Sequence, residues 1–191
     1  MKKFLIGIIV TIVIFFTVDI YLNWQKEDQK EKDEIRHEQT ESVNAKIKSG
    51  LKVGDKAPNF ILKTLSGEKV NLSDLIGKKV ILNFWATWCP PCREEMPAME
   101  QVYQKYKNQE VEIVAVNSTV GKETVDKVKE FTEELNITFP IPLDVEGEVF
   151  KVYQIYGLPT TYFINTKGVI HFVHFGPMDE SFMIQELEKM D

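Results

Sequence analysis

The sequence predicts an α/β fold in which helices cover both faces of a central sheet. Two apolar runs, Lys79–Trp85 and Val111–Asn117, are typical of buried strands. A segment with apolar residues three or four positions apart follows each run, as in a helix with one buried face. Two further strand-like runs and a last helical segment complete the region 51–191. Strands that alternate with helices in this way indicate a sheet between helical layers.

The region begins with a predicted hairpin. Asn59–Thr64 and Glu68–Asn71 have the composition of short strands, and Leu65-Ser66-Gly67 between them has the composition of a turn. Ser73 or Asp74 is then expected to cap a brief turn that Gly77 ends, before the first buried strand.

The later elements are predicted in the same way. The two helices after the buried strands are expected over Pro91–Tyr106 and Lys122–Leu135. Phe139–Leu143 is expected to be a short edge strand, because its two prolines cannot donate to a ladder. The remaining elements are a short helix over Glu148–Tyr156, hairpin strands over Thr160–Asn165 and Val169–Phe175, and a closing helix over Asp179–Met190.

Two segments precede this domain. Residues 1–23 carry two lysines followed by an apolar run without a polar stripe, which predicts a single transmembrane helix. No small-residue cleavage site follows the run, so we expect an uncleaved signal-anchor, with a cleaved signal peptide as the alternative. Residues 24–50 are rich in Lys, Glu, Asp and Gln and are expected to form a charged stalk. This arrangement predicts a single-pass protein of the cell membrane whose domain 51–191 lies on the extracytoplasmic side.

Composition excludes several classes of function. The chain has 191 residues and a formal net charge of −6, which argues against a nucleic-acid partner, because phosphate binding needs clustered Lys and Arg. It contains two cysteines, Cys89 and Cys92. Two are too few for a disulfide-stapled small scaffold or for a four-thiolate zinc site.

The two cysteines indicate redox chemistry. In Trp88-Cys89-Pro90-Pro91-Cys92 the first cysteine falls between a predicted strand and the start of a predicted helix. Free N–H groups and the helix dipole favour the thiolate at that place, and the thiol pKa can fall from about 8.5 to between roughly 3.5 and 7.5. Cys92, three residues later, can turn back and close a disulfide with Cys89. The pair can then alternate between dithiol and disulfide, with Cys89 attacking a substrate disulfide and Cys92 resolving the mixed disulfide.

Two other interpretations of the cysteines are open. A purely structural disulfide would gain little, because stabilisation of the chain rises with the length of the closed loop. A metal site could use Cys89 and Cys92 with His171 and His174. The two histidines fall in a predicted strand, where residues three apart point to opposite faces, so they cannot readily bind one ion.

Several motifs resemble a known family. The segment Phe84–Cys92 resembles the active-site signature of the thioredoxin superfamily, and it is most similar to that of the membrane-anchored TlpA/ResA-like thiol-disulfide oxidoreductases. Val53–Phe60, Leu72–Leu75 and Gly157–Thr160 also resemble that group. The resemblance covers residues 51–191. It implies a thioredoxin-like fold with an N-terminal β-hairpin and a central helix–strand insert, here residues 122–143.

The resemblance also implies a substrate-binding surface. By position, Pro159 would be a cis-proline that faces the disulfide. An extended substrate could then pair with the backbone of Leu158 as an added strand. A trans proline in an ordinary turn is the alternative. Trp88 and Pro90, which flank Cys89, are expected to bind substrate as well.

A third catalytic residue, Glu95, is implied by the resemblance. Thioredoxins carry a buried Asp six residues before the first cysteine, and here that residue is Asn83, which cannot exchange protons. The TlpA/ResA-like group uses a Glu three residues after the second cysteine, which corresponds to Glu95. The spacing places Glu95 near Cys92 on one helical face, and burial would raise its pKa so that it could accept the Cys92 proton. A solvated carboxylate in the first helical turn is the alternative, which Glu94 fits better.

The function that the resemblance implies is reduction of disulfides in exported proteins. Expected targets include apocytochrome c during cytochrome c biogenesis, and proteins of envelope or spore assembly. Electrons would come from a membrane thiol donor similar to CcdA-like proteins, and no dissociable cofactor is expected. A thiol peroxidase of peroxiredoxin type is an alternative, because residues 53–92 also resemble peroxiredoxin openings, and a metal carrier that uses Cys89 and Cys92 is another.

Overall fold

The computed structural model describes residues 25, 26 and 48–190. The chain divides into two compact units, residues 1–47 and 48–191, and almost all described residues belong to the second. The predicted transmembrane anchor and most of the predicted stalk therefore lie outside the described residues. Among the residues that are described, no helix has both the length and the apolar character needed to cross a membrane.

Six strands form two sheets in the described part of the chain. In the smaller sheet, β1 (Ile61–Lys63) pairs antiparallel with β2 (Lys69–Asn71), which confirms the predicted hairpin. The larger sheet has the order β4-β3-β5-β6, in which β3 runs parallel to β4 and antiparallel to β5, and β5 runs antiparallel to β6. Its strands are β3 (Lys79–Trp85), β4 (Val111–Asn117), β5 (Thr160–Ile164) and β6 (Ile170–Phe175).

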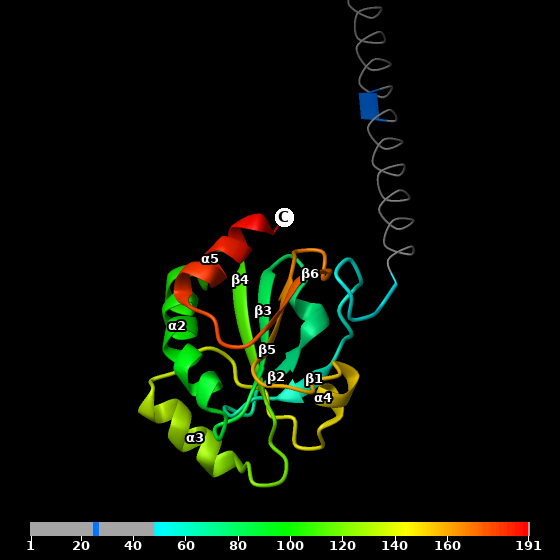
Figure 1. Cartoon of the computed structure of the whole chain (residues 1–191). Coiled ribbons are helices and arrows are strands. Elements are labelled where there is room, and N and C mark those ends of the chain that lie inside the picture. The colour runs from blue at the N-terminus through cyan, green and yellow to red at the C-terminus, as the bar shows by residue number, and fades with distance from the viewer. Residues whose placement is uncertain (1–24, 27–47, 191) are drawn as a thin grey trace, which may run out of the picture. The chain divides into compact units, whose positions relative to one another are not determined.

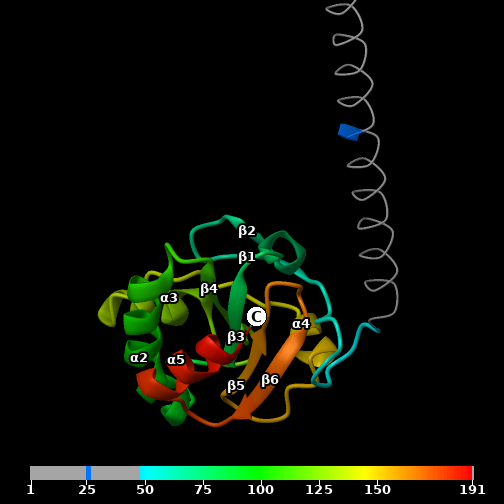
Figure 2. The same cartoon turned by 90° about the horizontal axis from the view of Figure 1, so that it is seen from above.

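Helices cover both faces of the larger sheet, as predicted (Figures 1 and 2). They are α2 (Pro90–Tyr106), α3 (Val125–Glu134), α4 (Glu148–Val152) and α5 (Glu180–Lys189), with a 3₁₀ turn η1 (Leu72–Leu75). Helices α2, α3 and α5 pack on one face, while α4 and η1 pack on the other.

Strand β3 supplies side chains to two cores because its residues alternate between the two faces. Ile81 and Trp85 belong to the core under α2, α3 and α5. Leu82 and Phe84 belong to the core under α4 and η1. Asn83 lies between Ile81 and Trp85 on the first face, so its polar side chain is directed toward α2, where the site described below lies.

The prediction of a strand over Phe139–Leu143 is wrong, and with it the strand expected in the helix–strand insert. Pro140 and Pro142 carry no N–H, and the segment makes only isolated bridges to its neighbours. The proline carbonyls accept hydrogen bonds from the N–H groups of Ala115 (3.1 Å) and Asn117 (2.9 Å) in β4. On its other side, the Leu143 N–H donates to the carbonyl of Lys63 in β1 (2.9 Å). The segment thus joins the edge of the larger sheet to the hairpin.

Other predicted boundaries need smaller corrections. Helix α3 begins at Val125 rather than Lys122, because the Thr124 side chain caps it by accepting a hydrogen bond from the Lys127 N–H. Helix α4 ends at Val152 instead of reaching Tyr156. The predicted cap of η1 is also wrong. Asn71 occupies the N-cap position without a side-chain cap bond, and Ser73 and Asp74 lie inside the turn.

Candidate active site

Cys89 lies at the junction between β3 and α2. Helix α2 begins at Pro90, one residue before the predicted start, and a proline fits there because its missing N–H has no intrahelical acceptor. Cys89 is the N-cap residue, with extended backbone (φ −93°, ψ 107°), and its sulfur accepts a hydrogen bond from the Cys92 N–H at 3.3 Å. In the reduced protein, such a position at the end of a helix favours the thiolate form of Cys89.

Cys89 and Cys92 form a disulfide, with a Cα–Cα distance of 5.3 Å. The side chain of Cys92 is fully buried, whereas that of Cys89 keeps 4% of its surface exposed. Cys89 also lines the groove described below, so a partner from solvent can approach Cys89 and not Cys92. A division between an attacking and a resolving cysteine requires such a difference in exposure.

A groove of about 510 Å³ opens beside the disulfide. Trp88 is 56% exposed and Tyr156 is 94% exposed, so each presents an aromatic surface to solvent at this groove. None of the side chains that line it carries a charge. They are Trp88, Cys89, Pro90, Pro91, Ser118, Phe150, Ile155, Tyr156, Gly157 and Leu158.

The structure brings together three of the four residues predicted to bind substrate, and the fourth, Pro159, is buried beside them in the chain and does not line the groove. Trp88, Pro90 and Leu158 line the same groove as Cys89. The peptide bond between Leu158 and Pro159 is cis, as the resemblance implied. The carbonyl of Pro159 accepts a hydrogen bond from the Gly176 N–H at 2.9 Å, which ties this loop to the end of β6. The residues of this groove that the sequence analysis did not single out are Ser118, Phe150, Ile155 and Tyr156.

Glu95 lies on α2, three residues after Cys92, and does not line the groove. Its side chain is 1% exposed, so the solvated alternative does not apply. Oε1 accepts a hydrogen bond from Asn83 Nδ2 (2.8 Å), and Oε2 accepts one from the Met178 N–H (3.1 Å). Burial raises the pKa of Glu95 to about 8, although the two hydrogen bonds oppose the rise. A carboxyl group with this pKa can take up or release a proton near neutral pH.

Sequence reasoning missed a second buried carboxylate, Glu123. Its side chain is 4% exposed and accepts three hydrogen bonds. Two come from Thr87, from the backbone N–H and the hydroxyl (both 2.8 Å), and one comes from Asn117 Nδ2 (3.0 Å). Glu123 thereby fixes the loop that precedes Cys89 to the end of β4. Along the chain it resembles an ordinary acidic residue at the start of a helix, so no sequence signal marks it.

The histidines do not join the cysteines in a metal site. Across residues 25, 26 and 48–190, no three side chains of His, Cys, Asp or Glu are grouped closely enough to hold an ion. His174 lies in β6 opposite Thr161, and its ring packs against Phe182 of α5, with a centroid distance of 4.7 Å.

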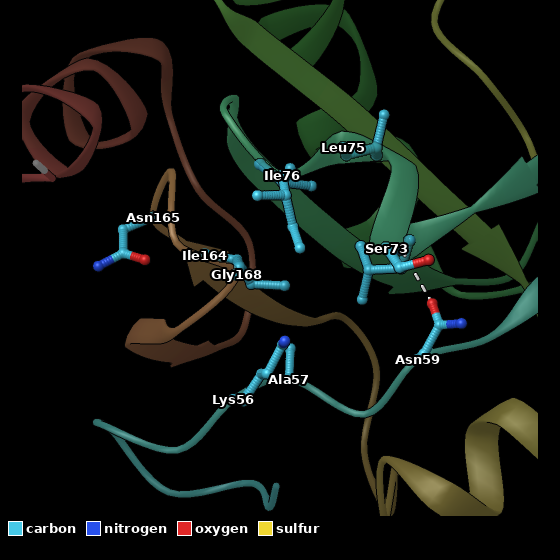
Figure 3. A pocket seen from close by; sticks show the side chains of 11 residues that line it. Lys56, Ala57, Asn59, Ser73, Leu75, Ile76, Ile164, Asn165 and Gly168 are labelled. Carbon is cyan, nitrogen blue, oxygen red and sulfur yellow. Dashed lines mark hydrogen bonds between the residues drawn. The ribbon is translucent and has the colours of Figure 1, made fainter. Parts of the chain in front are cut away.

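A separate cavity of about 40 Å³ lies between η1 and the turn that joins β5 to β6 (Figure 3). Its wall includes Ile76, Ile164 and Gly168, and the Ser73 N–H donates to Asn59 Oδ1 at its rim (2.9 Å). Neither cysteine and no carboxyl group lines it. The groove beside Cys89 is therefore the candidate active site.

Comparisons with known proteins agree with this assignment. A model of the AhpC/TSA family matches residues 53–173. The thioredoxin-like protein YneN of Bacillus subtilis is 39% identical over 188 residues, which cover 98% of each chain. The thiol-disulfide oxidoreductase ResA of Bacillus subtilis is 44% identical over 134 residues, which cover 70% of this chain and 73% of ResA.

The fold also resembles solved structures. The crystal structure of a thiol:disulfide interchange protein DsbE from Chlorobium tepidum superposes with a TM-score of 0.67 at 34% identity. The match covers 73% of this chain and 98% of that protein. The fold is therefore thioredoxin-like.

Proposed function

Since the chain belongs to the AhpC/TSA family and is a thiol-disulfide oxidoreductase, we propose that it reduces disulfides in exported proteins through Cys89 and Cys92. One observation carries the proposal. The sulfur of Cys89 lies at a helix N-terminus in an open, uncharged groove, and its disulfide partner Cys92 is sealed behind it.

The proposed reaction begins from the dithiol. The Cys89 thiolate attacks one sulfur of the substrate disulfide, a mixed disulfide forms, and the other substrate sulfur leaves as a thiolate. Cys92 then attacks the Cys89 sulfur, which releases the second substrate thiolate and forms the enzyme disulfide. Two electrons pass from the enzyme to the substrate. A membrane thiol donor similar to CcdA-like proteins would return two electrons to the Cys89–Cys92 disulfide.

Glu95 would accept the proton that Cys92 loses in the resolving step. Cys92 is a nucleophile only as a thiolate, and its burial opposes the charge. Glu95, three residues later on α2, has a pKa of about 8 and can accept that proton as Cys92 attacks. Glu95 would return it to Cys92 when the enzyme disulfide is reduced.

The groove supports a protein substrate in extended conformation. Leu158 lines the groove together with Trp88 and Pro90, and its backbone would pair with an added strand. We propose a position on the extracytoplasmic side of the cell membrane, held there by the apolar run in residues 1–23. Proposed targets are apocytochrome c before haem attachment and proteins of envelope or spore assembly.

The peroxidase alternative is not favoured. A peroxidase of this superfamily relies on one peroxidatic cysteine with Thr and Arg beside it, whereas here both cysteines close one disulfide. A peroxide-consumption assay on the purified protein separates the two functions. We expect no peroxide turnover above that of a Cys89→Ser control.

Trapping of substrates tests the proposal directly. In cells that produce Cys92→Ser, mixed disulfides on Cys89 cannot be resolved, so exported partners remain attached and separate only after reduction. Cys89→Ser in the same background is the matched control. A membrane-impermeant maleimide should label Cys89 of the Cys92→Ser protein in intact cells. Absence of trapped partners, or labelling only after lysis, would contradict the proposal.

A further inference from the structure

Asn83 carries an unexplained buried acceptor. The side chain is fully buried on β3, and Nδ2 donates to Glu95 Oε1 (2.8 Å) and to Thr161 Oγ1 (3.0 Å). In the described part of the chain, Asn83 Oδ1 is the buried side-chain polar atom that has no hydrogen-bond partner. Because Oδ1 is bonded to nothing, this amide is held at its Nδ2 end alone, and no hydrogen bond of Oδ1 has to break for it to turn into a second arrangement.

That arrangement follows from the shape of the amide group. Rotation by half a turn about the Cβ–Cγ bond exchanges the positions of Oδ1 and Nδ2. Oδ1 would then lie where Nδ2 lies now, which is 2.8 Å from Glu95 Oε1. Two oxygens that close attract each other only if a proton lies between them, so the rotated amide requires protonated Glu95. The present orientation, with Nδ2 toward Oε1, suits ionised Glu95.

The surroundings allow both orientations. The hydroxyl of Thr161 accepts from Nδ2 now and can donate to Oδ1 after rotation. Each orientation leaves one end of the amide unpaired, so the proton on Glu95 decides between them. The other polar contact of this carboxyl group is the Met178 N–H, 3.1 Å from Oε2, and it is the same in both arrangements. Cys92, one turn earlier on α2, is the nearby titratable group that the mechanism uses.

We propose that Asn83 is a positioning residue that follows the protonation of Glu95, donating to the carboxylate and, after rotating, accepting from the carboxylic acid. The proposal rests on the proposed function, since it concerns the proton that Glu95 exchanges with Cys92. As Cys92 attacks, its proton moves to Glu95 and the amide rotates. When the proton returns, the amide rotates back. Neither Asn83 nor Glu95 is oxidised or reduced in these steps.

The test is the protonation midpoint of Glu95 in the oxidised full-length protein, followed by infrared titration. Loss of the carboxyl band in Glu95→Gln identifies the signal. Asn83→Leu removes both the donor to the carboxylate and the acceptor for the carboxylic acid, and the bond to the charged form is the stronger, so we expect the midpoint to rise by roughly half to one pH unit. Loss of an amide that only donates would raise it further. Rotation has its own signal: in the parent, the carbonyl band of Asn83, identified by its loss in Asn83→Leu, should shift at the same midpoint as Glu95. Thr161→Val removes the hydroxyl that accepts from Asn83 Nδ2, and it should raise the midpoint by less. Thr132→Val, which removes a buried hydroxyl on α3 that bonds to the Lys129 carbonyl, should leave it unchanged.

A merely structural role for Asn83 would lower stability without moving this midpoint. An Asn83 carbonyl band that stays fixed while Glu95 titrates would overturn the proposal, and so would unchanged midpoints in Asn83→Leu and Thr161→Val. If Asn83→Leu folds poorly, the midpoint in Thr161→Val decides. The proposed function fails in a different way. If Glu95→Gln exchanged disulfides at the parental rate from pH 5 to 9, Glu95 would have no part in turnover, whereas the infrared midpoints would still report on Asn83.

Discussion

The carboxyl group of Glu95 is held where ionisation is costly. Burial raises its pKa from 4.5 to about 8, so the folded protein binds this proton more tightly than the unfolded chain does. Between those two pH values the native state holds more protons, and stability must fall as pH rises. A shift of this size corresponds to at most about 5 kcal/mol.

Glu95→Gln should therefore flatten the pH dependence of stability. We expect the oxidised variant to be as stable as the parent near pH 5 and more stable at pH 9, where the parent carries a buried charge. Urea denaturation at pH 5, 7 and 9 measures this difference. Glu94→Gln, which changes an exposed neighbour on the same helix, is the matched control and should follow the parent. Parallel curves for Glu95→Gln and the parent would contradict the raised pKa.

Tyr156 is expected to contribute to recognition of protein substrates. Its ring is 94% exposed at the groove beside Cys89, a position that favours contact with an apolar side chain of a bound peptide. Tyr156→Ala should raise KM for a protein disulfide about tenfold, which corresponds to about 1.4 kcal/mol of binding. The rate with oxidised glutathione, which has no apolar side chain to place against the ring, should stay unchanged.

Steady-state kinetics with both substrates tests this expectation. Ile61→Ala, which truncates an exposed apolar side chain on β1 outside the groove, serves as the control. Equal losses with the protein disulfide and with glutathione would show that Tyr156 supports the site itself and not substrate binding.

At the scale of elements, the loop between β3 and α2 depends on a residue of another segment. Glu123 accepts hydrogen bonds from Thr87 and Asn117, and its removal would leave buried donors without partners. Glu123→Ala should lower the free energy of unfolding by about 3 kcal/mol, and Glu123→Gln should lower it by less. Denaturant unfolding of the oxidised protein measures both. Glu130→Ala, at an exposed site on α3, should change the free energy of unfolding little. A similar loss in all three variants would show that the hydrogen bonds of Glu123 do not stabilise this loop.

The same elements show why sequence reasoning succeeds in some places and fails in others. Strands β3 and β4 have the predicted bounds because long uniform apolar runs leave few other structures open. The prediction of a strand over Phe139–Leu143 fails because strand pairing needs N–H groups that its two prolines lack. The cysteines are evident from their spacing, whereas the contacts of Glu123 with Thr87 join residues 36 positions apart and no local pattern records them.

The groove shows the same limit. Trp88 and Pro90 follow from their position beside Cys89, and Leu158 follows from the resemblance. Phe150 and Tyr156 reach the groove only because α4, which contains Phe150, and the chain just after it lie beside the segment that follows β3. The burial of Glu95 depends on Met178 from a distant loop as well as on its own helix.

At the scale of the molecule, the unit 48–191 contains both cores. Ile81, Met96 and Phe163 form part of one, and Phe84 and Tyr153 form part of the other. These side chains are fully buried by other residues of the same unit. A unit with a continuous four-stranded sheet and a core on each face can fold alone.

A fragment of residues 48–191 should therefore retain the fold and the exchange activity. Because the apolar run of residues 1–23 is absent from it, the fragment should stay in the soluble fraction, whereas the full chain should sediment with membranes. Circular dichroism, insulin reduction and membrane fractionation measure the three properties. A full chain with Cys89→Ser controls for activity that does not depend on the active site. If the fragment unfolds, residues 1–47 contribute to the core. If the full chain stays soluble, the first segment does not anchor it, and the proposed place of action at the membrane is wrong.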